Sequence, residues 1–332
     1  MLFLSSHDQR KVIKMGEVID AVSVALSEYS GQRAITPIRT ALYLKKSEGT
    51  SLFMPSFVEA ANSLGVKFVS VFPNNTAMEK KTIYGLMVLA DTETGEPLAI
   101  LEASYLTVIR TGAASGLASK LMAKENAKVL SVIGTGAKSR GIIQAIREVR
   151  PIEEIRLYNR HAHKAYELAH ELMESAEAEQ RMLEITVASD ADQAIGEADI
   201  IVTATNSMHP VFSKEAVPSG VHVNAVGSFR PDMQELPTHL IAHADKIVVE
   251  SRELALEESG DFIIPEKQGL FDPASIYAEL GEIVCGLKPG RERHDETTVF
   301  KSVGLAAMDV VVAKAIYDRA LSAGVGMQIP MT

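Results

Sequence analysis

The stretch that decides the fold reads VLSVIGTGAKSRG and spans residues 129–141. Its first five residues predict a buried strand, and a helix is expected to begin at about Ala137. Between them, Gly134 permits a tight turn, and Gly136 lets the backbone approach a phosphate at the helix N-terminus. This strand–turn–helix context predicts a pyrophosphate-binding turn of a dinucleotide site, with Ser139 where a third glycine usually stands.

Predicted strands and helices alternate along the chain after this turn. Buried strands are expected at 129–133, 155–158, 183–187, 200–204, 221–226 and 247–250, with a late addition at 298–301. Helical patterns such as 141–149 and 163–177 separate the earlier strands. Apolar strands that alternate with helices predict a Rossmann-type, doubly wound parallel sheet with both faces covered.

The chain before residue 105 has a different pattern. An amphipathic helix is predicted at 15–30, and short apolar runs separated by turn signals follow at 39–44, 51–54, 64–72, 82–90 and 97–102. A mainly antiparallel sheet is therefore expected, joined to the Rossmann part by a helix at 106–123. A closing helix at 305–321 is expected to return to this sheet. The chain is thus predicted to be α/β, with a Rossmann domain at 119–305 and a smaller α+β domain at 1–118 and 306–332.

The end of the second parallel strand bears on the choice of cofactor. An acidic residue that holds the ribose 2′-hydroxyl of NAD is expected about 20 residues after the glycine turn. Asn159 and Arg160 stand there instead. Because an arginine can pair with a 2′-phosphate, the sequence favours NADPH, with NADH as the alternative cofactor.

Composition excludes several classes of partner. The formal net charge of −10 argues against nucleic acid, and no apolar run approaches the length of a membrane span. The single cysteine, Cys285, excludes an intrachain disulfide and fits a reducing cytoplasm. Residues 1–8 lack the features of a secretory signal. The histidines show no metal-ligand spacing, so no metal is expected.

Three cations interrupt apolar or small-residue stretches of the first domain. Arg39, Lys67 and Arg110 each occupy such a position. A buried cation is costly unless it meets an anion or faces a cleft. Each of them, taken singly, is interpreted as a paired or snorkelling structural cation rather than a ligand. Two arginines and a lysine that converge would suit a small carboxylate.

These features together resemble the ornithine cyclodeaminase/mu-crystallin family over nearly the whole chain. The matching segments are 65–67 (GVK), 105–115 (YLTVIRTGAAS), 133–137 (IGTGA), 223–236 (VNAVGSFRPDMQEL) and 300–304 (FKSVG). The resemblance implies a homodimer in which the smaller domain supplies the substrate groups and the dimer interface.

The resemblance also implies roles for individual residues. Arg39, Lys67 and Arg110 would bind the substrate carboxylate, Thr82 would lie beside the nicotinamide or substrate, and Ser302 and Val303 would lie beside both. Lys67 is the predicted catalytic residue. The predicted cofactor-binding residues are Thr82, Arg110, Gly134, Gly136, Ala137, Lys138, Asn159, Arg160, Thr203, Val223, Asn224, Ala225, Val226 and Ser302.

The family carries out several reactions, and one departure helps to choose among them. Its cyclodeaminases carry an aspartate where this chain has Phe229. The segment 228–232 (SFRPD) instead resembles that of the family's ketimine reductases. The expected activity is NAD(P)H-dependent reduction of a small anionic cyclic imine: 1-pyrroline-2-carboxylate to L-proline, or 1-piperideine-2-carboxylate to L-pipecolate. Alternatives are an alanine dehydrogenase-type amino-acid dehydrogenase, an ornithine cyclodeaminase, and a non-catalytic protein that binds NADPH and a ligand.

Overall fold

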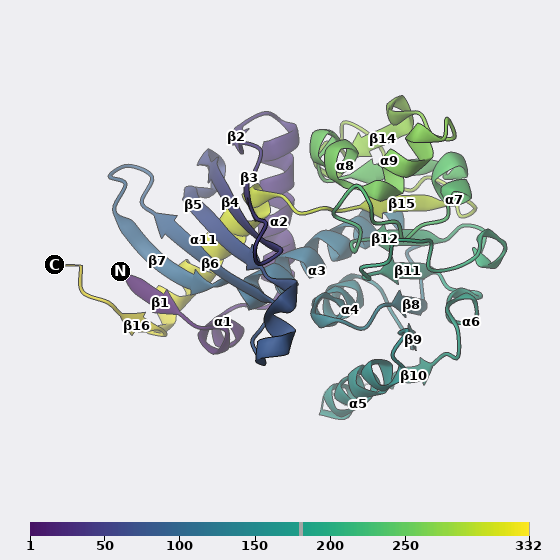
Figure 1. The fold of residues 1–332 in the computed structure, drawn as a ribbon, viewed down its shortest axis with the longest axis horizontal. Helices are drawn as coiled ribbons and strands as arrows, with labels where there is room; N and C mark the ends of the chain where they lie inside the picture. Colours follow the sequence, from purple (N-terminus) through teal and green to yellow (C-terminus); the bar gives the residue numbers. More distant parts are fainter. Residues whose placement is uncertain (179–181, 332) are drawn as a thin grey trace. The chain divides into compact units, whose positions relative to one another are not determined.

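The computed structural model describes residues 1–178 and 182–331. This part of the chain divides into two compact units, whose elements are labelled in Figure 1. The first unit comprises Met1–Arg110 and the chain from Leu305 onward, and the second comprises Thr111–Gly304.

The second unit is built on a parallel sheet of eight strands among the described residues, in the order β10-β9-β8-β11-β12-β15-β13-β14. These strands are β8 (Val129–Ile133), β9 (Glu154–Tyr158), β10 (Glu184–Val187), β11 (Ile200–Thr203), β12 (His222–Ala225), β13 (Lys246–Val249), β14 (Ile276–Glu279) and β15 (Thr298–Lys301). The strand order reverses direction between β8 and β11, which is the switch point where such sheets bind ligands. The predicted α/β class with a doubly wound parallel sheet is therefore confirmed.

One strand prediction needs correction and another is confirmed. The run at 183–187 was expected to be buried, but β10 is the edge strand of the sheet and none of its residues is buried, since neighbours cover it on one side only. The strand predicted at 298–301 is confirmed as β15, which lies inside the sheet, between β12 and β13. All four of its residues are buried.

Helices cover both faces of this sheet. One face carries apolar residues of α4 (Ala137–Val149) and α5 (Ala162–Ala178). The other carries apolar residues of α6 (Ala191–Ile195), α7 (Thr238–His243), α8 (Arg252–Glu258) and α9 (Gly260–Lys267). The short helix α10 (Leu280–Val284) follows β14.

The first unit is built on a mainly antiparallel sheet. Its strands are β1 (Leu2–Leu4), β2 (Ala34–Ile35), β3 (Thr40–Leu44), β4 (Gly49–Val58), β5 (Ser63–Val71), β6 (Ile83–Ala90), β7 (Pro97–Glu102) and β16 (Met327–Gln328). Only the pairing of β1 with β7 is parallel among the described residues. The helices α1 (Ser6–Val12) and α2 (Met15–Ser30) belong to this unit.

The closing helix α11 (Ala306–Ala323) completes the first unit. It packs on β4, β5 and β6 and on α2, so that one face of the sheet is covered (Figure 1). Most of its residues are small or β-branched, and all from Ala306 to Ala313 are buried. Small side chains let the helix approach the sheet closely. The prediction of a helix at 305–321 that returns to the first sheet is confirmed.

The connecting helix α3 (Ala103–Met122) crosses from the first unit into the second at Arg110. Within the second unit it lies very close to α4. A Cβ atom added to Gly112 would meet the backbone oxygen of Gly141 at 2.3 Å, and one added to Gly116 would meet the Cβ of Ala145 at 2.8 Å. Glycine at these positions is therefore a condition of the helix contact.

We expect Gly112→Ala to lower the free energy of unfolding by about 1–3 kcal/mol, because one methyl group must displace backbone at this contact. Gly196→Ala is the matched control, since its Cβ would meet no atom nearer than 3.7 Å. Thermal and urea unfolding of both variants measure the effect. Equal stability of the two variants would contradict the close contact.

Candidate active site

The glycine turn lies in the second unit, between β8 and α4. Gly134 has a φ of +93°, and an added Cβ would meet the backbone oxygen of Ala204 at 2.7 Å. Gly136 is the N-cap residue of α4, and nothing lies within 4 Å of its Cβ position. The N-terminal N–H groups of α4, beginning with Ala137 and Lys138, can therefore face an anion at this open approach.

Ser139 occupies the third position of the glycine pattern. Its side chain is fully buried, and its Oγ donates a hydrogen bond of 2.6 Å to the backbone oxygen of Gly134. A small hydroxyl thus replaces the usual glycine and also ties the first helical turn to the strand end. The departure from the full glycine pattern leaves the geometry of the turn intact.

Asn159 and Arg160 follow the end of β9. The Asn159 Nδ2 donates to Thr135 Oγ1 at 2.7 Å, and its Oδ1 accepts from the His161 backbone N–H at 3.1 Å. Asn159 therefore joins the loop after β9 to the glycine turn. Arg160 is exposed, so its guanidinium is accessible to a ligand at this edge of the sheet.

The loops after β11 and β12 are held together by one carboxylate, which the sequence reasoning did not assign. Glu235 is fully buried and accepts hydrogen bonds from Thr203 Oγ1, from the Thr205 N–H and Oγ1, and from the Gly227 and Ser228 N–H groups. Burial raises the pKa of Glu235, while Lys301 lowers it and Asp261 raises it. The carboxylate fixes two strand ends where a ligand would bind.

A Cβ atom at Gly227 would lie 2.3 Å from Glu235 Oε1, so a glycine is needed there. Both residues lie within the segment that carried the family resemblance. The signal that could have found Glu235 is its position in that segment, shortly after the end of β12.

The remaining predicted residues of the strand ends are buried to different degrees. Val223, Asn224 and Ala225 have no exposed surface, and Val226 is 2% exposed. The Asn224 amide donates to Ser119 Oγ at 3.0 Å, and the Lys138 ammonium donates to the Val226 backbone oxygen at 3.4 Å. The backbone of this loop, and the Asn224 side chain, are thus engaged within the second unit.

Ser302 and Val303 follow β15 and are held by a second buried carboxylate, Glu250. It accepts from Ser302 Oγ and from the Val303 N–H, both at 2.8 Å, and from the Gly304 N–H. The sequence reasoning did not assign Glu250 either. Its hydrogen bonds hold the backbone of the three residues that follow β15.

In the first unit the structure brings Lys67 and Arg110 onto one carboxylate. Lys67 lies on β5 between Met54 of β4 and Met87 of β6, on the face that α11 covers. Its ammonium donates to Asp309 Oδ2 at 2.5 Å, and Arg110 Nε donates to Asp309 Oδ1 at 3.0 Å. The three side chains are no more than 7% exposed.

The environment lowers the pKa of Lys67 from 10.5 to about 8. Burial is the largest cause, the charge of Asp309 opposes it, and the charges of Arg110 and Arg39 lower the pKa further. Lys67 can therefore gain and lose a proton near neutral pH, which an ordinary lysine does not.

Asp309 was missed by the sequence reasoning. It is the acid in an otherwise apolar run of α11, AAMDVVVA, and the rule that singled out buried cations applies equally to a buried anion. Arg39 lies in the loop before β3 and is half-buried, and its charge acts on Lys67. Thr82 precedes β6, and its backbone oxygen accepts from the Phe72 N–H at 2.8 Å.

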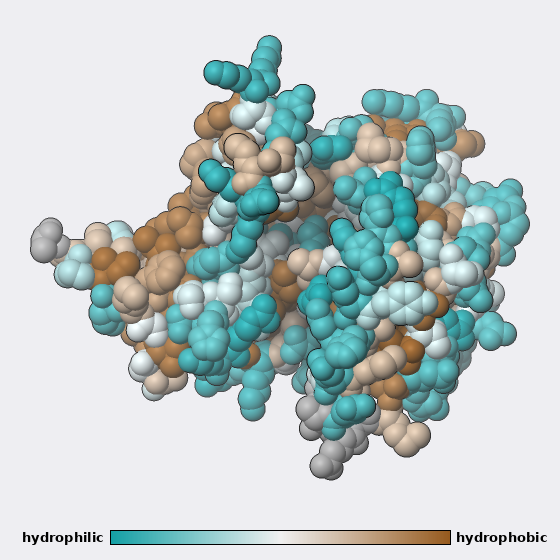
Figure 2. Space-filling model, turned by 60° about the horizontal axis from the view of Figure 1, so that its bottom comes forward, coloured by the Kyte–Doolittle hydropathy of each residue, from teal (hydrophilic) through white to brown (hydrophobic). Residues whose placement is uncertain are grey.

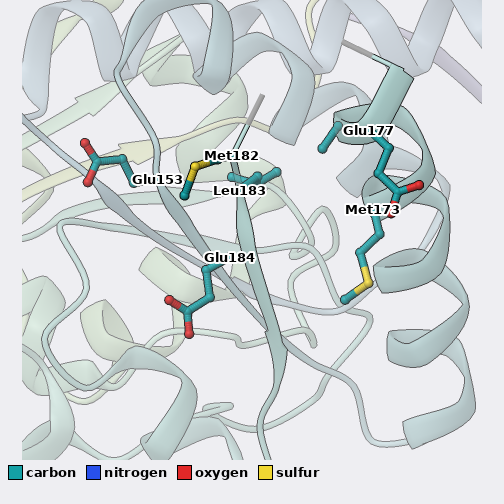
Figure 3. A pocket seen from close by; sticks show the side chains of 7 residues that line it. Glu153, Met173, Glu177, Met182, Leu183 and Glu184 are labelled. Carbon is teal, nitrogen blue, oxygen red and sulfur yellow. The ribbon is translucent and has the colours of Figure 1, made fainter. Parts of the chain in front are cut away.

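A separate pocket of about 550 Å³ lies on the second unit between α5 and β10. Figure 3 shows the side chains that line it, among them Glu153, Glu177 and Glu184. Its carboxylates would repel a dinucleotide phosphate or a carboxylate substrate, and it contains none of the predicted site residues. We therefore locate the candidate site at the residues described above.

No group of three or more histidine, cysteine, aspartate or glutamate side chains within residues 1–178 and 182–331 could hold a metal ion. No helix in the same part of the chain is long and apolar enough to cross a membrane.

The fold and the glycine turn define a two-unit α/β protein with a Rossmann-type sheet. The model of the ornithine cyclodeaminase/mu-crystallin family matches residues 1–324, so the chain belongs to this family, as the motifs predicted.

Individual relatives agree with this assignment. The chain is 53% identical over 329 residues to a Delta(1)-pyrroline-2-carboxylate reductase of Bacillus cereus, covering 99% of both chains. It is 40% identical to the Delta(1)-pyrroline-2-carboxylate reductase of Thermococcus litoralis, solved in complex with NADH and L-proline, with a TM-score of 0.94 and coverage of 99% and 100%. An archaeal alanine dehydrogenase dimer with bound NAD is 34% identical, with a TM-score of 0.90 and coverage of 100% and 99%.

Proposed function

We propose that this protein is an NAD(P)H-dependent reductase of a cyclic ketimine carboxylate, which converts 1-pyrroline-2-carboxylate to L-proline. The six-membered 1-piperideine-2-carboxylate is a second candidate substrate, since it carries the same imine and carboxylate. The observation that carries the proposal is the buried Lys67–Asp309–Arg110 cluster, in a chain that is 53% identical to a reductase of this imine.

The second unit is proposed as the cofactor-binding domain and the first as the substrate-binding domain. The glycine turn fits a pyrophosphate, because Gly134 adopts a backbone conformation with positive φ and the helix N-terminus beside Gly136 is open. Further cofactor contacts are assigned to the strand-end and loop residues predicted from the sequence. When bound, the reduced nicotinamide supplies a hydride.

The chemistry of the substrate indicates what the first unit must do. Arg110 and Arg39 would hold the carboxylate, and Lys67 would donate a proton to the imine nitrogen. The Lys67 N–H bond breaks as the new N–H bond forms, and the added hydride forms a C–H bond at C2 as the C=N π bond opens. Imine, proton and hydride together give the secondary amine. Thr82, Ser302 and Val303 are proposed to orient the reacting groups, which lowers the entropic part of the barrier.

An amino-acid dehydrogenase is the second candidate, because the archaeal alanine dehydrogenase aligns over the whole chain at 34% identity. That reaction forms its imine from a keto acid and ammonia and then reduces it in the same way. The two functions differ only in the source of the imine, so the choice of substrate distinguishes them.

We propose a homodimer that forms through the exposed face of the sheet in the first unit. Phe53, Phe68 and Leu86 are cross-strand neighbours and point away from the face that contains Lys67. Phe53 and Leu86 are exposed, and Leu42, Leu44 and Tyr84 are exposed on the same side. Figure 2 shows apolar side chains gathered over the strands of this unit (left). Apolar patches of this kind mark interaction surfaces. The exposed free Cys285 fits a proposed cytoplasmic location.

We expect rapid NADPH oxidation with 1-pyrroline-2-carboxylate, and weaker or no oxidation with pyruvate plus ammonia.

Lys67→Met should lower kcat/KM by about 10²–10⁴-fold, because it removes the proton donor. Arg110→Lys should raise KM by about 10- to 100-fold, because a lysine lacks the planar fork. Lys11→Met, at an exposed position of α1, is the control. Faster turnover of pyruvate with ammonia would favour the dehydrogenase, and no turnover of either would leave a binding protein.

Arg160→Ala should raise the KM for NADPH by about tenfold and leave the KM for NADH unchanged, because only NADPH carries the 2′-phosphate. Steady-state kinetics with both cofactors measure this, and NADH serves as the control within each preparation. An equal change for the two cofactors would remove Arg160 from the recognition of the phosphate.

Leu86→Lys should convert a dimer into a monomer of 35.9 kDa, because it places a charge in the proposed interface. Tyr166→Lys, at an exposed position of α5 in the second unit, is the matched control. Light scattering after size-exclusion chromatography gives the masses. A Leu86→Lys protein that stays dimeric would move the interface elsewhere.

A further inference from the structure

The carboxylate of Asp309 divides its two oxygens between two cations that come from different elements. Oδ2 accepts from Lys67 on β5, and Oδ1 accepts from Arg110 on α3. All three groups are buried, so each charge is worth more here than at the surface. Without the carboxylate, two cations would face each other in a desolvated site.

The contact with Asp309 determines which side of Arg110 remains for a ligand. Asp309 takes the Nε–H, and we find no hydrogen bond from the terminal Nη1 or Nη2 to any residue within 1–178 and 182–331. Those terminal nitrogens form the end of the guanidinium fork, which matches a carboxylate bidentately. Asp309 thus turns Arg110 so that its end, rather than its side, is presented to a ligand.

The same carboxylate acts on Lys67. The charged groups that act on this ammonium are Asp309 on α11, Arg110 on α3 and Arg39 before β3, while Met54 and Met87 flank it on the neighbouring strands. Burial and both arginines favour the neutral amine, and Asp309 favours the ammonium. The charge state of Lys67 near neutral pH therefore depends on Asp309.

We propose that Asp309 is a positioning residue of the active site, which keeps Lys67 protonated and orients Arg110 so that its terminal nitrogens meet the substrate carboxylate. This inference rests on the proposed function, since it assigns Lys67 the role of proton donor. With Asp309 ionised, Lys67, Arg110 and Arg39 leave a net positive site, which attracts a monoanion.

The test is a titration of Lys67 in the ligand-free protein, followed by NMR of lysines carrying ¹³C at Cε. Lys67→Met assigns the Lys67 signal by its absence. In the unaltered protein the Lys67 midpoint is expected at about 8. In Asp309→Asn, which keeps the volume and removes the charge, the midpoint should fall by at least about one pH unit. Glu28→Gln, which removes a carboxylate paired with Arg33 in the same unit, should leave it unchanged.

The kinetic counterpart is the alkaline limb of the kcat/KM profile for NADPH and 1-pyrroline-2-carboxylate. Activity falls as pH rises through the pKa of Lys67, because the ammonium is the active form. In Asp309→Asn this limb should move to lower pH by the same amount as the NMR midpoint, and KM should rise. In Asp309→Glu the alkaline limb should return most of the way to its position in the unaltered protein, because the negative charge is present again. The titration of the imine itself cancels in the comparison, since all variants use one substrate.

A second measurement covers the case in which Asp309→Asn does not fold. The Lys67 signal, followed in Asp309→Ser, which also removes the charge, should titrate at lower pH than in the unaltered protein. An unchanged Lys67 midpoint in Asp309→Asn, or in Asp309→Ser where only that variant folds, would overturn the inference. The NMR results stand even if no imine is reduced, so a failure of the proposed function is seen separately.

Discussion

The buried contact of Asp309 with Lys67 and Arg110 is the constraint on which the first unit depends. The three residues lie far apart in the sequence, and each would be costly to bury alone. They can be buried together only if α11, which follows the whole second unit, returns to the sheet beside β5. The return of α11 to the sheet and the neutralisation of the two cations therefore depend on each other. This explains why an acid stands in the otherwise apolar first half of α11.

Two buried carboxylates hold loop backbone in place in the second unit. Glu235 gathers the loops after β11 and β12, and Glu250 gathers the residues after β15. Each uses its oxygens to accept backbone N–H groups that the strands no longer satisfy. The carboxyl ends of the parallel strands are thereby made rigid in places where the proposed cofactor must find a preorganised surface. The residues proposed to bind substrate and cofactor are thus held by buried acids that are not themselves proposed as ligands.

The sheet of the first unit separates two tasks by the alternation of its side chains. Along β5, Lys67 faces α11 while Phe68 faces the opposite side. A shift of one residue in the register would exchange the two faces and place the ammonium on the apolar surface. The position of Lys67, the proposed proton donor, and the proposed dimer interface are therefore set by the same strand pairing.

The sequence by itself determined the fold class, the glycine turn at Gly134 and Gly136, the helix that closes the chain, and the family. These follow from local patterns: apolar periodicity, turn residues, and motifs within a few residues of each other. The short strands β1, β14 and β16, the interior place of β15 and the partners Asp309, Glu235 and Glu250 were decided only by the tertiary structure. Strands β1 and β16, of three and two residues, are too short to show a pattern of their own, and a buried acid shows its role only when distant donors reach it.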